Sequence, residues 1–480
     1  METGKRIIKN TAFLTGGKIL GDFLVFFFLA YFGRIFGLEI LGKYAFAMSI
    51  GGILTVVYSL GFNTLTTREV SRDRSQNAKY LGNLLITRGV LSLIVWGLVG
   101  IVLWFTPLSF DTKIIILLIT GYHVFYKLTG LLRCAFIAHQ EMQYPAFLEF
   151  FHRLIILSLG GACIFFLKNP VMTLAVYPLS TLMMFLVGFF VFHKKYGLPD
   201  FDFDSSFVKK CIIESIPFLF IMVLTQFYDR IGIVILTLLK GEAASGTFAA
   251  GDRLFVVVTT TMTMFSASLF PVMSQYSVQA KEKLIKLSIQ TSRILIVLLL
   301  PLSLLIYILS PEVIAITFGE KFSDSAAVLQ TLTWALIFIG LNSILSNFLI
   351  VKDRQNVLLK IRTVIYGLHL LTSFALIWRF DYQGLACARL LSEVLLFIAT
   401  LFCIQRSFEK IPVLRMMLVP SFACCVGILI YQQMEAWPLW FVLPCVVAVY
   451  LVLLFFPRGI EINDLLYLKQ IFSTRTDTSD

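Results

Sequence analysis

The sequence is poor in charge, and this scarcity limits the kinds of protein that it can encode. Only 14% of its 480 residues are charged, whereas 58% are hydrophobic and the mean hydropathy is +0.87. The net charge of +12 has no long polar segment on which to form a nucleic-acid surface. The composition excludes a soluble domain and a nucleic-acid partner, and it predicts an integral membrane protein.

The sequence also lacks the residue patterns of catalytic and metal sites. Its eight cysteines form no CxxC pair and lie in or beside apolar runs, so we interpret them as small buried residues. Its five histidines show no metal-ligand spacing, and no Gly-x-Ser-x-Gly turn occurs. The stretch GLEILGKY at 37–44 approaches a phosphate-binding loop, but Tyr44 replaces the Mg²⁺-binding hydroxyl residue. We therefore expect no enzyme, metal or cofactor.

Long apolar runs are abundant instead, and they predict an all-α polytopic membrane protein with about 14 transmembrane helices. Most Lys and Arg residues between the spans fall in the first ten residues, the tail and the odd-numbered connections, which predicts cytoplasmic termini. The first run is too long and too charged for a cleavable signal, so it is expected to remain as a span. The predicted spans lie near residues 11–33, 43–63, 82–106, 113–138, 146–167, 171–192, 211–239, 247–271, 293–317, 327–350, 362–380, 384–404, 414–432 and 438–456.

Charged residues inside these spans point toward function. The first span carries Lys18 and Asp22 on one helical face. A charge that faces lipid at mid-bilayer costs about 2.5 to 3.5 kcal/mol on insertion scales, so this face must turn toward protein or water. The basic residues within spans are Lys18, Arg88, Lys127, Arg133, Arg153, Arg230, Arg253 and Arg389, and the acidic ones are Asp22, Glu149, Asp229, Asp252 and Glu393.

Two interpretations of this set remain open. Lys18/Asp22, Glu149/Arg153 and Arg389/Glu393 are each four residues apart, which suits ion pairs that fix helix packing. The whole set is larger than packing needs and is mostly basic, which favours a water-filled cavity for an anionic cargo. The five acidic residues are then candidates for coupling to proton or sodium flow.

An internal repeat predicts two similar halves. The loop at 37–47, GLEILGKYAFA, recurs 204 residues later at 241–251 as GEAASGTFAAG, and both loops join an odd-numbered span to an even-numbered one. The halves then share one orientation and form two six-helix lobes related by a pseudo-twofold axis, with two further C-terminal helices. The predicted domains are an N-lobe at 1–195, a cytoplasmic linker at 196–210, a C-lobe at 211–410, and two helices with a cytoplasmic tail at 411–480.

Residues 34–44, RIFGLEILGKY, followed by Gly61-Phe-Asn and Thr67-Arg-Glu-Val-Ser-Arg, resemble the N-terminal signature of the Wzx-type oligosaccharide flippases. These flippases belong to the multidrug/oligosaccharidyl-lipid/polysaccharide exporter superfamily. The resemblance implies an inner-membrane transporter that moves a polyprenyl-diphosphate-linked oligosaccharide to the outer leaflet by alternating access. It also implies membrane lipid and polysaccharide polymerase machinery as partners. Flippases of this kind have a cationic substrate cavity, and the resemblance implies that the eight basic residues above line it.

The same resemblance leaves a multidrug cation antiporter as the alternative. That function predicts an anionic, aromatic-lined cavity, which the surplus of basic residues within spans disfavours. In the multidrug branch a first-span acid couples transport to cations, and Asp22 is a counterpart that Lys18 would partly neutralise. Two energy sources for flipping remain open: the membrane potential, and antiport of protons or sodium ions.

Overall fold

The computed structural model describes residues 2–279, 281–407, 411–434 and 437–455, with side chains from residue 21 onward except at 278–281 and 455. Throughout these ranges the regular structure is helical and contains no strand, so the all-α prediction is confirmed. The helices are α1 (Glu2–Ser59), α2 (Phe62–Arg72), α3 (Asn77–Trp104), α4 (Phe110–Ala138), α5 (Gln143–Ile155), α6 (Pro170–Tyr196), α7 (Ser205–Lys240), α8 (Glu242–Gln279), α9 (Lys281–Thr317), α10 (Ser325–Thr333), α11 (Ala335–Val351), α12 (Gln355–Ser407), α13 (Val413–Gln433) and α14 (Leu439–Phe455).

Short helical pieces connect or extend these helices. Two 3₁₀ turns, Arg74–Gln76 and Glu320–Phe322, precede α3 and α10. Two π-helical turns, Ile156–Gly160 and Cys163–Leu167, continue α5. Such turns add a residue to the helical repeat and shift the faces on either side.

Ten described helical segments are long and apolar enough to cross a membrane, so the chain is a multi-pass membrane protein. Two of the long helices each extend over two predicted spans. α1 changes direction at Gly37, where φ is +86°, and α12 does so at Asp381, where φ is +57°. The count of about fourteen spans stays a prediction.

The structure divides into two compact units. The first comprises residues 1–257, 314–325 and 369–385, and the second comprises 258–313, 326–368 and 386–480. These units are defined by proximity in space, whereas the predicted lobes are defined along the sequence. The lobe boundaries therefore stay a prediction.

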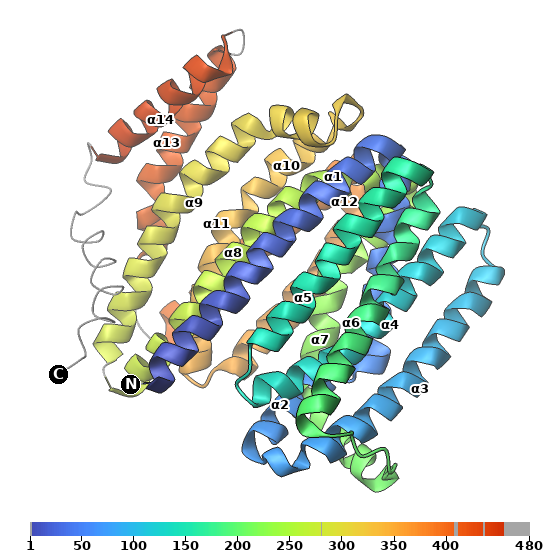
Figure 1. The fold of residues 1–480 in the computed structure, drawn as a ribbon. Coiled ribbons are helices and arrows are strands. Elements are labelled where there is room, and N and C mark those ends of the chain that lie inside the picture. The colour runs from blue at the N-terminus through green and yellow to red at the C-terminus, as the bar shows by residue number, and fades with distance from the viewer. Residues whose placement is uncertain (1, 280, 408–410, 435–436, 456–480) are drawn as a thin grey trace. The chain divides into compact units, whose positions relative to one another are not determined.

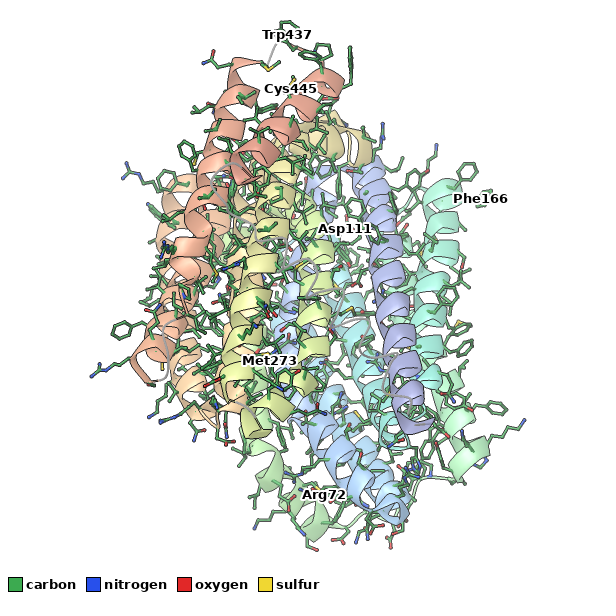
Figure 2. The ribbon with its side chains drawn as sticks, turned by 90° about the vertical axis from the view of Figure 1, so that its left-hand side faces the viewer. Arg72, Asp111, Phe166, Met273, Trp437 and Cys445 are labelled. Carbon is green, nitrogen blue, oxygen red and sulfur yellow. The ribbon has the colours of Figure 1, made fainter. Side chains whose placement is uncertain are left out.

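In the first unit, α4 is the central helix. It packs against α6, α3, α2 and α1, and α1 also packs against α5 and α7 (Figure 1). Phe62, Leu84, Leu131, Phe136 and Phe192 fill the core between α2, α3, α4 and α6. In lipid such packing stabilises through close contact rather than through release of water. Large apolar side chains cover the outside instead, and Phe166, which is 77% exposed, projects from the surface (Figure 2).

In the second unit, α9 and α11 pack with α13, α14 and parts of α8 and α12 around an apolar core. Helices α13 and α14 lie side by side, and Gly427 admits side chains from α9 and α14. Their connecting end carries Trp437, and Cys445 lies nearby on α14 (Figure 2).

The repeated loops meet within the first unit. Gly37 and Gly241 have nearly the same backbone conformation, with φ of +86° and +90° and ψ of 179° and 178°. A Cβ atom on Gly42 would lie 1.7 Å from the carbonyl oxygen of Glu242, and one on Gly246 would lie 1.9 Å from that of Leu38. Gly246 follows Gly42 by 204 residues, and Glu242 follows Leu38 by 204 residues. The two contacts are therefore equivalent under the repeat. We call this pair of contacts the glycine contact.

The connection between α6 and α7 is extended and docks on α3. The side-chain amide of Asn83 donates to the Asp202 carbonyl oxygen at 3.2 Å and accepts from the Asp204 backbone N–H at 2.8 Å. Lys79 forms an ion pair with Asp204 at 3.1 Å. Hydrogen bonds from Ser206 and the Phe207 N–H, together with Lys79, lower the pKa of Asp204. Helix α7 begins at Ser205, within the range predicted as a linker.

Candidate functional site

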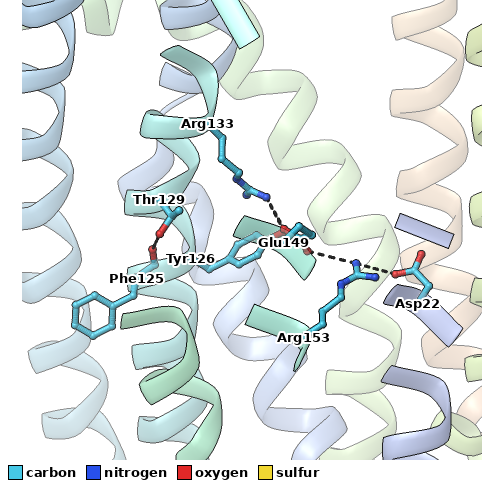
Figure 3. A network of polar contacts seen from close by, with 7 residues as sticks. All are labelled: Asp22, Phe125, Tyr126, Thr129, Arg133, Glu149 and Arg153. Atoms are coloured by element: carbon cyan, nitrogen blue, oxygen red, sulfur yellow. Dashed lines mark hydrogen bonds and ion pairs between the residues drawn. The ribbon is translucent and has the colours of Figure 1, made fainter. Parts of the chain in front are cut away.

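Two arginines from neighbouring helices share one carboxylate inside the first unit. Arg133 of α4 lies 2.6 Å from one Glu149 oxygen, and Arg153 of α5 lies 3.3 Å from the other. Arg153 also pairs with Asp22 of α1 at 3.0 Å (Figure 3). We call Asp22, Arg133, Glu149 and Arg153 the four-charge network. The predicted Glu149/Arg153 pair is confirmed, and the network extends it to two further helices.

The local backbone makes this network possible. Glu149 and Arg153 lie on one face of α5 because they are four residues apart. Gly21 leaves room for the Arg153 guanidinium, since a Cβ there would lie 1.8 Å from its Nη1 atom. The four side chains retain between 9% and 20% exposure, so the network is partly accessible and not sealed within the core.

Aromatic side chains extend from this network. Tyr126 lies next to it, with the Arg133 guanidinium 4.6 Å from its ring centroid and the phenol oxygen 3.4 Å from Arg133 Nη1. A positive charge over an aromatic face is stabilised by the ring quadrupole. Thr129, also drawn in Figure 3, bonds instead to the Phe125 carbonyl oxygen of its own helix at 2.9 Å.

The aromatic rings continue as a row from α4 to α1. Tyr126 stacks on Tyr122 at 5.7 Å, Tyr122 meets Tyr177 of α6 at 5.5 Å, and Tyr177 meets Tyr44 of α1 at 5.5 Å. The Arg253 guanidinium lies 5.8 Å from the Tyr44 ring centroid. The tyrosine row therefore links two cations, Arg133 and Arg253. Sequence reasoning missed it, although Tyr122 and Tyr126 occur at helical spacing.

Arg88 is placed differently from the network arginines. It is fully buried on α3, and it donates to the Asn63 side chain at 2.9 Å, to the Lys127 carbonyl oxygen at 2.6 Å and to the Ser59 carbonyl oxygen at 3.1 Å. These bonds tie together α1, α2, α3 and α4. The geometry favours a packing role for this residue.

Arg230 of α7 approaches α1 closely. Its Nη1 donates to the Met48 carbonyl oxygen at 2.8 Å, and a Cβ on Gly52 would lie 2.2 Å from its Nε. Gln226, one turn earlier, donates to the Gly52 carbonyl oxygen at 2.9 Å. The missing side chain at Gly52 thus lets an arginine pack flat on α1.

The remaining predicted residues are distributed over both units. In the first unit Lys127, Asp252 and Arg253 are half-buried and Asp229 is exposed, whereas the Lys18 side chain lies outside the described residues. In the second unit Glu393 is buried, and its carboxylate accepts from Asn342 at 2.9 Å. Arg389 is half-buried one turn before Glu393. Among the described side chains, no three His, Cys, Asp or Glu residues gather as metal ligands would.

Comparisons with known proteins give a consistent picture. A family model described as "Polysaccharide biosynthesis protein" matches residues 7–277, and one described as "Lipid II flippase MurJ" matches 179–451. A putative O-antigen transporter of Shigella dysenteriae is 23% identical over 390 residues, which cover 79% of this chain and 95% of that protein.

Solved structures share the fold. The lipid II flippase MurJ, in an inward closed conformation, aligns with a TM-score of 0.76 and 13% identity over 96% of this chain and 99% of its own. An inward-facing multidrug resistance MATE family transporter of the MOP superfamily aligns with a TM-score of 0.66 and 14% identity over 80% and 94%. The chain therefore shares the overall helical fold of these two structures.

Proposed function

Because the chain belongs to the polysaccharide biosynthesis protein family, whose model matches more than half of it, we propose that it flips a lipid-linked oligosaccharide across the membrane. The cargo in this proposal is a saccharide on a polyprenyl diphosphate, which moves from the cytoplasmic to the outer leaflet by alternating access. The chain is a transporter and not an enzyme. The putative O-antigen transporter and the MurJ family model support this function over drug export.

In this proposal the arginines of the four-charge network bind the diphosphate of the cargo. Arginine donates paired hydrogen bonds to phosphate oxygens, and Arg133 and Arg153 offer two such groups on either side of Glu149. In the observed state Glu149 and Asp22 neutralise them. A diphosphate has more acceptor oxygens than one carboxylate, so it would replace Glu149 between the two guanidinium groups.

Other cations extend this binding surface in the proposal. Arg253 lies at the far end of the tyrosine row, and Lys127 lies on the same helix as Tyr126. Within the first unit Arg230 is also nominated from the sequence, and Arg88 contributes through packing. Lys18 and Arg389 remain nominated from the sequence alone. We place both termini in the cytoplasm and the chain in the inner membrane, where a polysaccharide polymerase would use the flipped product.

The membrane potential favours this direction of transport. When the cell interior is negative, a headgroup with about two negative charges gains about 2.3 kcal/mol per charge per 100 mV as it moves outward. This energy is available without an ion gradient. Coupling through Asp22, Glu149, Asp229, Asp252 or Glu393 would add to it.

The test is a flipping assay in proteoliposomes. Purified chain would be reconstituted with a fluorescent polyprenyl-diphosphate saccharide, and the rate at which the label becomes accessible from outside would be measured. We expect Arg133→Gln and Arg153→Lys to slow flipping at least about tenfold, because both lose paired donors to phosphate. Arg72→Gln, which removes a surface guanidinium, is the matched control and should flip normally.

Folding of each variant is checked by its thermal unfolding before the rates are compared. Normal flipping by both network variants would remove the arginines from the proposal. Drug-dependent cation exchange without any flipping by the wild type would establish the antiporter instead.

A further inference from the structure

A buried histidine lies beside the four-charge network and takes no part in its ion pairs. His152 of α5 follows Glu149 by three residues and directly precedes Arg153. It is 4% exposed, and neither of its ring nitrogens has a hydrogen-bond partner among the described residues. Buried polar groups in proteins are nearly always hydrogen-bonded, so this imidazole retains both a donor and an acceptor for something else.

Aromatic rings hold the imidazole in place. Its centroid lies 5.8 Å from that of Tyr122, with the ring planes 29° apart, and 6.0 Å from that of Tyr126, with the planes 55° apart. Both tyrosines belong to the row on α4. The ring is therefore fixed in orientation by stacking, while its nitrogens remain available.

Charged and titratable groups reach the surroundings of His152 from several helices. Its own helix supplies Glu149 and Arg153, α4 supplies Lys127, Arg133, Tyr122 and Tyr126, α1 supplies Asp22, and α6 supplies Tyr177. The π-helical turn Ile156–Gly160, which also packs on α5, has no titratable side chain. Within the four-charge network two guanidinium groups face two carboxylates, so its net charge is zero.

Because the four-charge network has no net negative charge, it offers little to offset a proton added to the imidazole. A buried imidazolium beside two guanidinium groups would lose hydration and suffer like-charge repulsion. Both Glu149 oxygens are already occupied by arginines, so that carboxylate is also a poor proton acceptor. His152 is then a base next to these arginines with an uncommitted lone pair, and His123, whose Nε2 also lacks a hydrogen-bond partner among the described residues, lies against Tyr122.

Binding of a diphosphate changes the balance. It adds about two negative charges to a neutral network, which favours an added proton on the nearest available base. We infer that His152 is a proton-binding site, and that it takes up one proton when an anionic headgroup binds the neighbouring arginines. The proton comes from bulk water and forms one N–H bond on the ring. This inference rests on the proposed function, and it deepens that function by naming a ligand bound together with the cargo.

A consequence for transport follows directly. If the proton travels outward with the headgroup, the moving unit carries one negative charge fewer. The rate then responds less steeply to the membrane potential and becomes sensitive to cytoplasmic pH. None of the five acidic residues nominated from the sequence needs to carry this proton.

Proton uptake can be measured by calorimetry on the full chain in nanodiscs. The probe is UDP-glucose, a soluble sugar diphosphodiester whose own charges stay fixed between about pH 6 and pH 8. Titrations in buffers of different ionisation enthalpy give the number of protons bound per ligand. Between pH 8 and pH 6 we expect uptake of about 0.5 to 1 proton per ligand for the wild type, and therefore an affinity that rises about 10- to 100-fold over this range.

The variants His152→Asn and His152→Gln each keep one polar atom at the place of a ring nitrogen. Both should bind UDP-glucose with no proton uptake and with an affinity that is independent of pH. His193→Gln, which replaces an exposed histidine on α6, is the control and should behave as the wild type. Proton uptake that persists in both His152 variants, or binding to the wild type without uptake, would overturn the inference and leave the flippase proposal intact.

Two further outcomes of the experiment are distinguished by additional measurements. If both variants fail to fold, solid-state ¹⁵N spectra of histidine-labelled wild type replace them. One of its five histidines should change from imidazole to imidazolium when UDP-glucose is added, and no change would refute the inference. If the wild type neither binds UDP-glucose nor flips lipid-linked saccharide, the proposed function fails together with the inference.

Discussion

Replacing Gly42 with alanine should force the two repeated loops apart. The added Cβ would lie 1.7 Å from the Glu242 carbonyl oxygen, so the backbones must separate by about 1.7 Å to reach an ordinary contact of 3.4 Å. Overpacking of this kind costs about 1 to 3 kcal/mol. The shift also stretches two bonds to the Glu242 carboxylate, from Thr112 at 2.6 Å and from Lys43 at 3.6 Å.

The assay is thermal unfolding of the purified full-length chain in detergent, followed by intrinsic fluorescence. We expect Tm of Gly42→Ala and of Gly246→Ala to fall by about 1 to 3 °C, since the entropy of unfolding grows with chain length. Gly89→Ala is the matched control, because Gly89 lies in α3 with nothing within 4 Å of the methyl group that alanine would add and has no unusual backbone angle. There alanine should be neutral or should stabilise by up to about 1 kcal/mol.

The double variant makes the prediction more demanding. Both methyl groups require the same separation of the two backbones, so the first substitution relieves most of the clash introduced by the second. The combined loss should be clearly smaller than the sum of the single losses, as for residues that share one contact. Full additivity, or a Gly42→Ala protein as stable as the control, would refute the reasoning from the glycine contact.

Three other substitutions test features of the first unit. Arg88→Met should destabilise the chain by at least about 3 kcal/mol, because three buried acceptors lose their donor, and a stable variant defective only in flipping would instead indicate cargo contact. Asn83→Leu should release the connection between α6 and α7, so limited proteolysis should cut there faster than in the wild type, with equal rates contradicting the docking. Burial alone would raise the pKa of Glu141, but hydrogen bonds from Lys195 and Tyr196 outweigh it and lower the pKa. The stabilisation by Glu141 is therefore present above its unfolded pKa of about 4.3 and is lost as pH falls through the folded value. Tm of Glu141→Gln should be lower than that of the wild type at pH 7, and the difference should shrink in acid; a constant difference would contradict this.

The sequence predicts pairing within helices better than pairing between them. Spacing alone identifies Glu149 and Arg153 as partners, and the structure confirms it. The same argument pairs Asp22 with Lys18, yet the described partner of Asp22 is Arg153 of α5. Helical periodicity places two residues on one face but does not tell which helix lies opposite that face.

The aromatic and histidine residues of the site are invisible in the sequence for a similar reason. His152 has no metal-ligand spacing, and its environment is made by Tyr122 and Tyr126 of another helix. The sequence also does not show which glycines make room for a side chain of another helix. Gly21 and Gly52 each make room for an arginine from a distant segment, and no local sequence pattern predicts this packing.

The helical class follows from composition, whereas the bends and the docked connection do not. At Gly37 and Asp381 a single residue with positive φ redirects the chain without a loop, so polar breaks in the sequence do not mark helix ends. The acidic stretch before α7 has the composition of a solvated linker. Its contact with α3 includes the Lys79–Asp204 ion pair and two bonds to the side-chain amide of buried Asn83, which take the place of bonds that a neighbouring backbone would make.

The glycine contact has the geometry of a homodimer interface enclosed within one chain. In a true homodimer every side chain appears on both sides of the axis, so a charge pair must occur twice. Here Lys43 pairs with Glu242, but the counterparts of these residues at the offset of 204 are Thr247 and Leu38, which cannot form an ion pair. Because both loops belong to one chain, their side chains need not match, and a backbone contact that is alike on both sides carries its charge on one side alone.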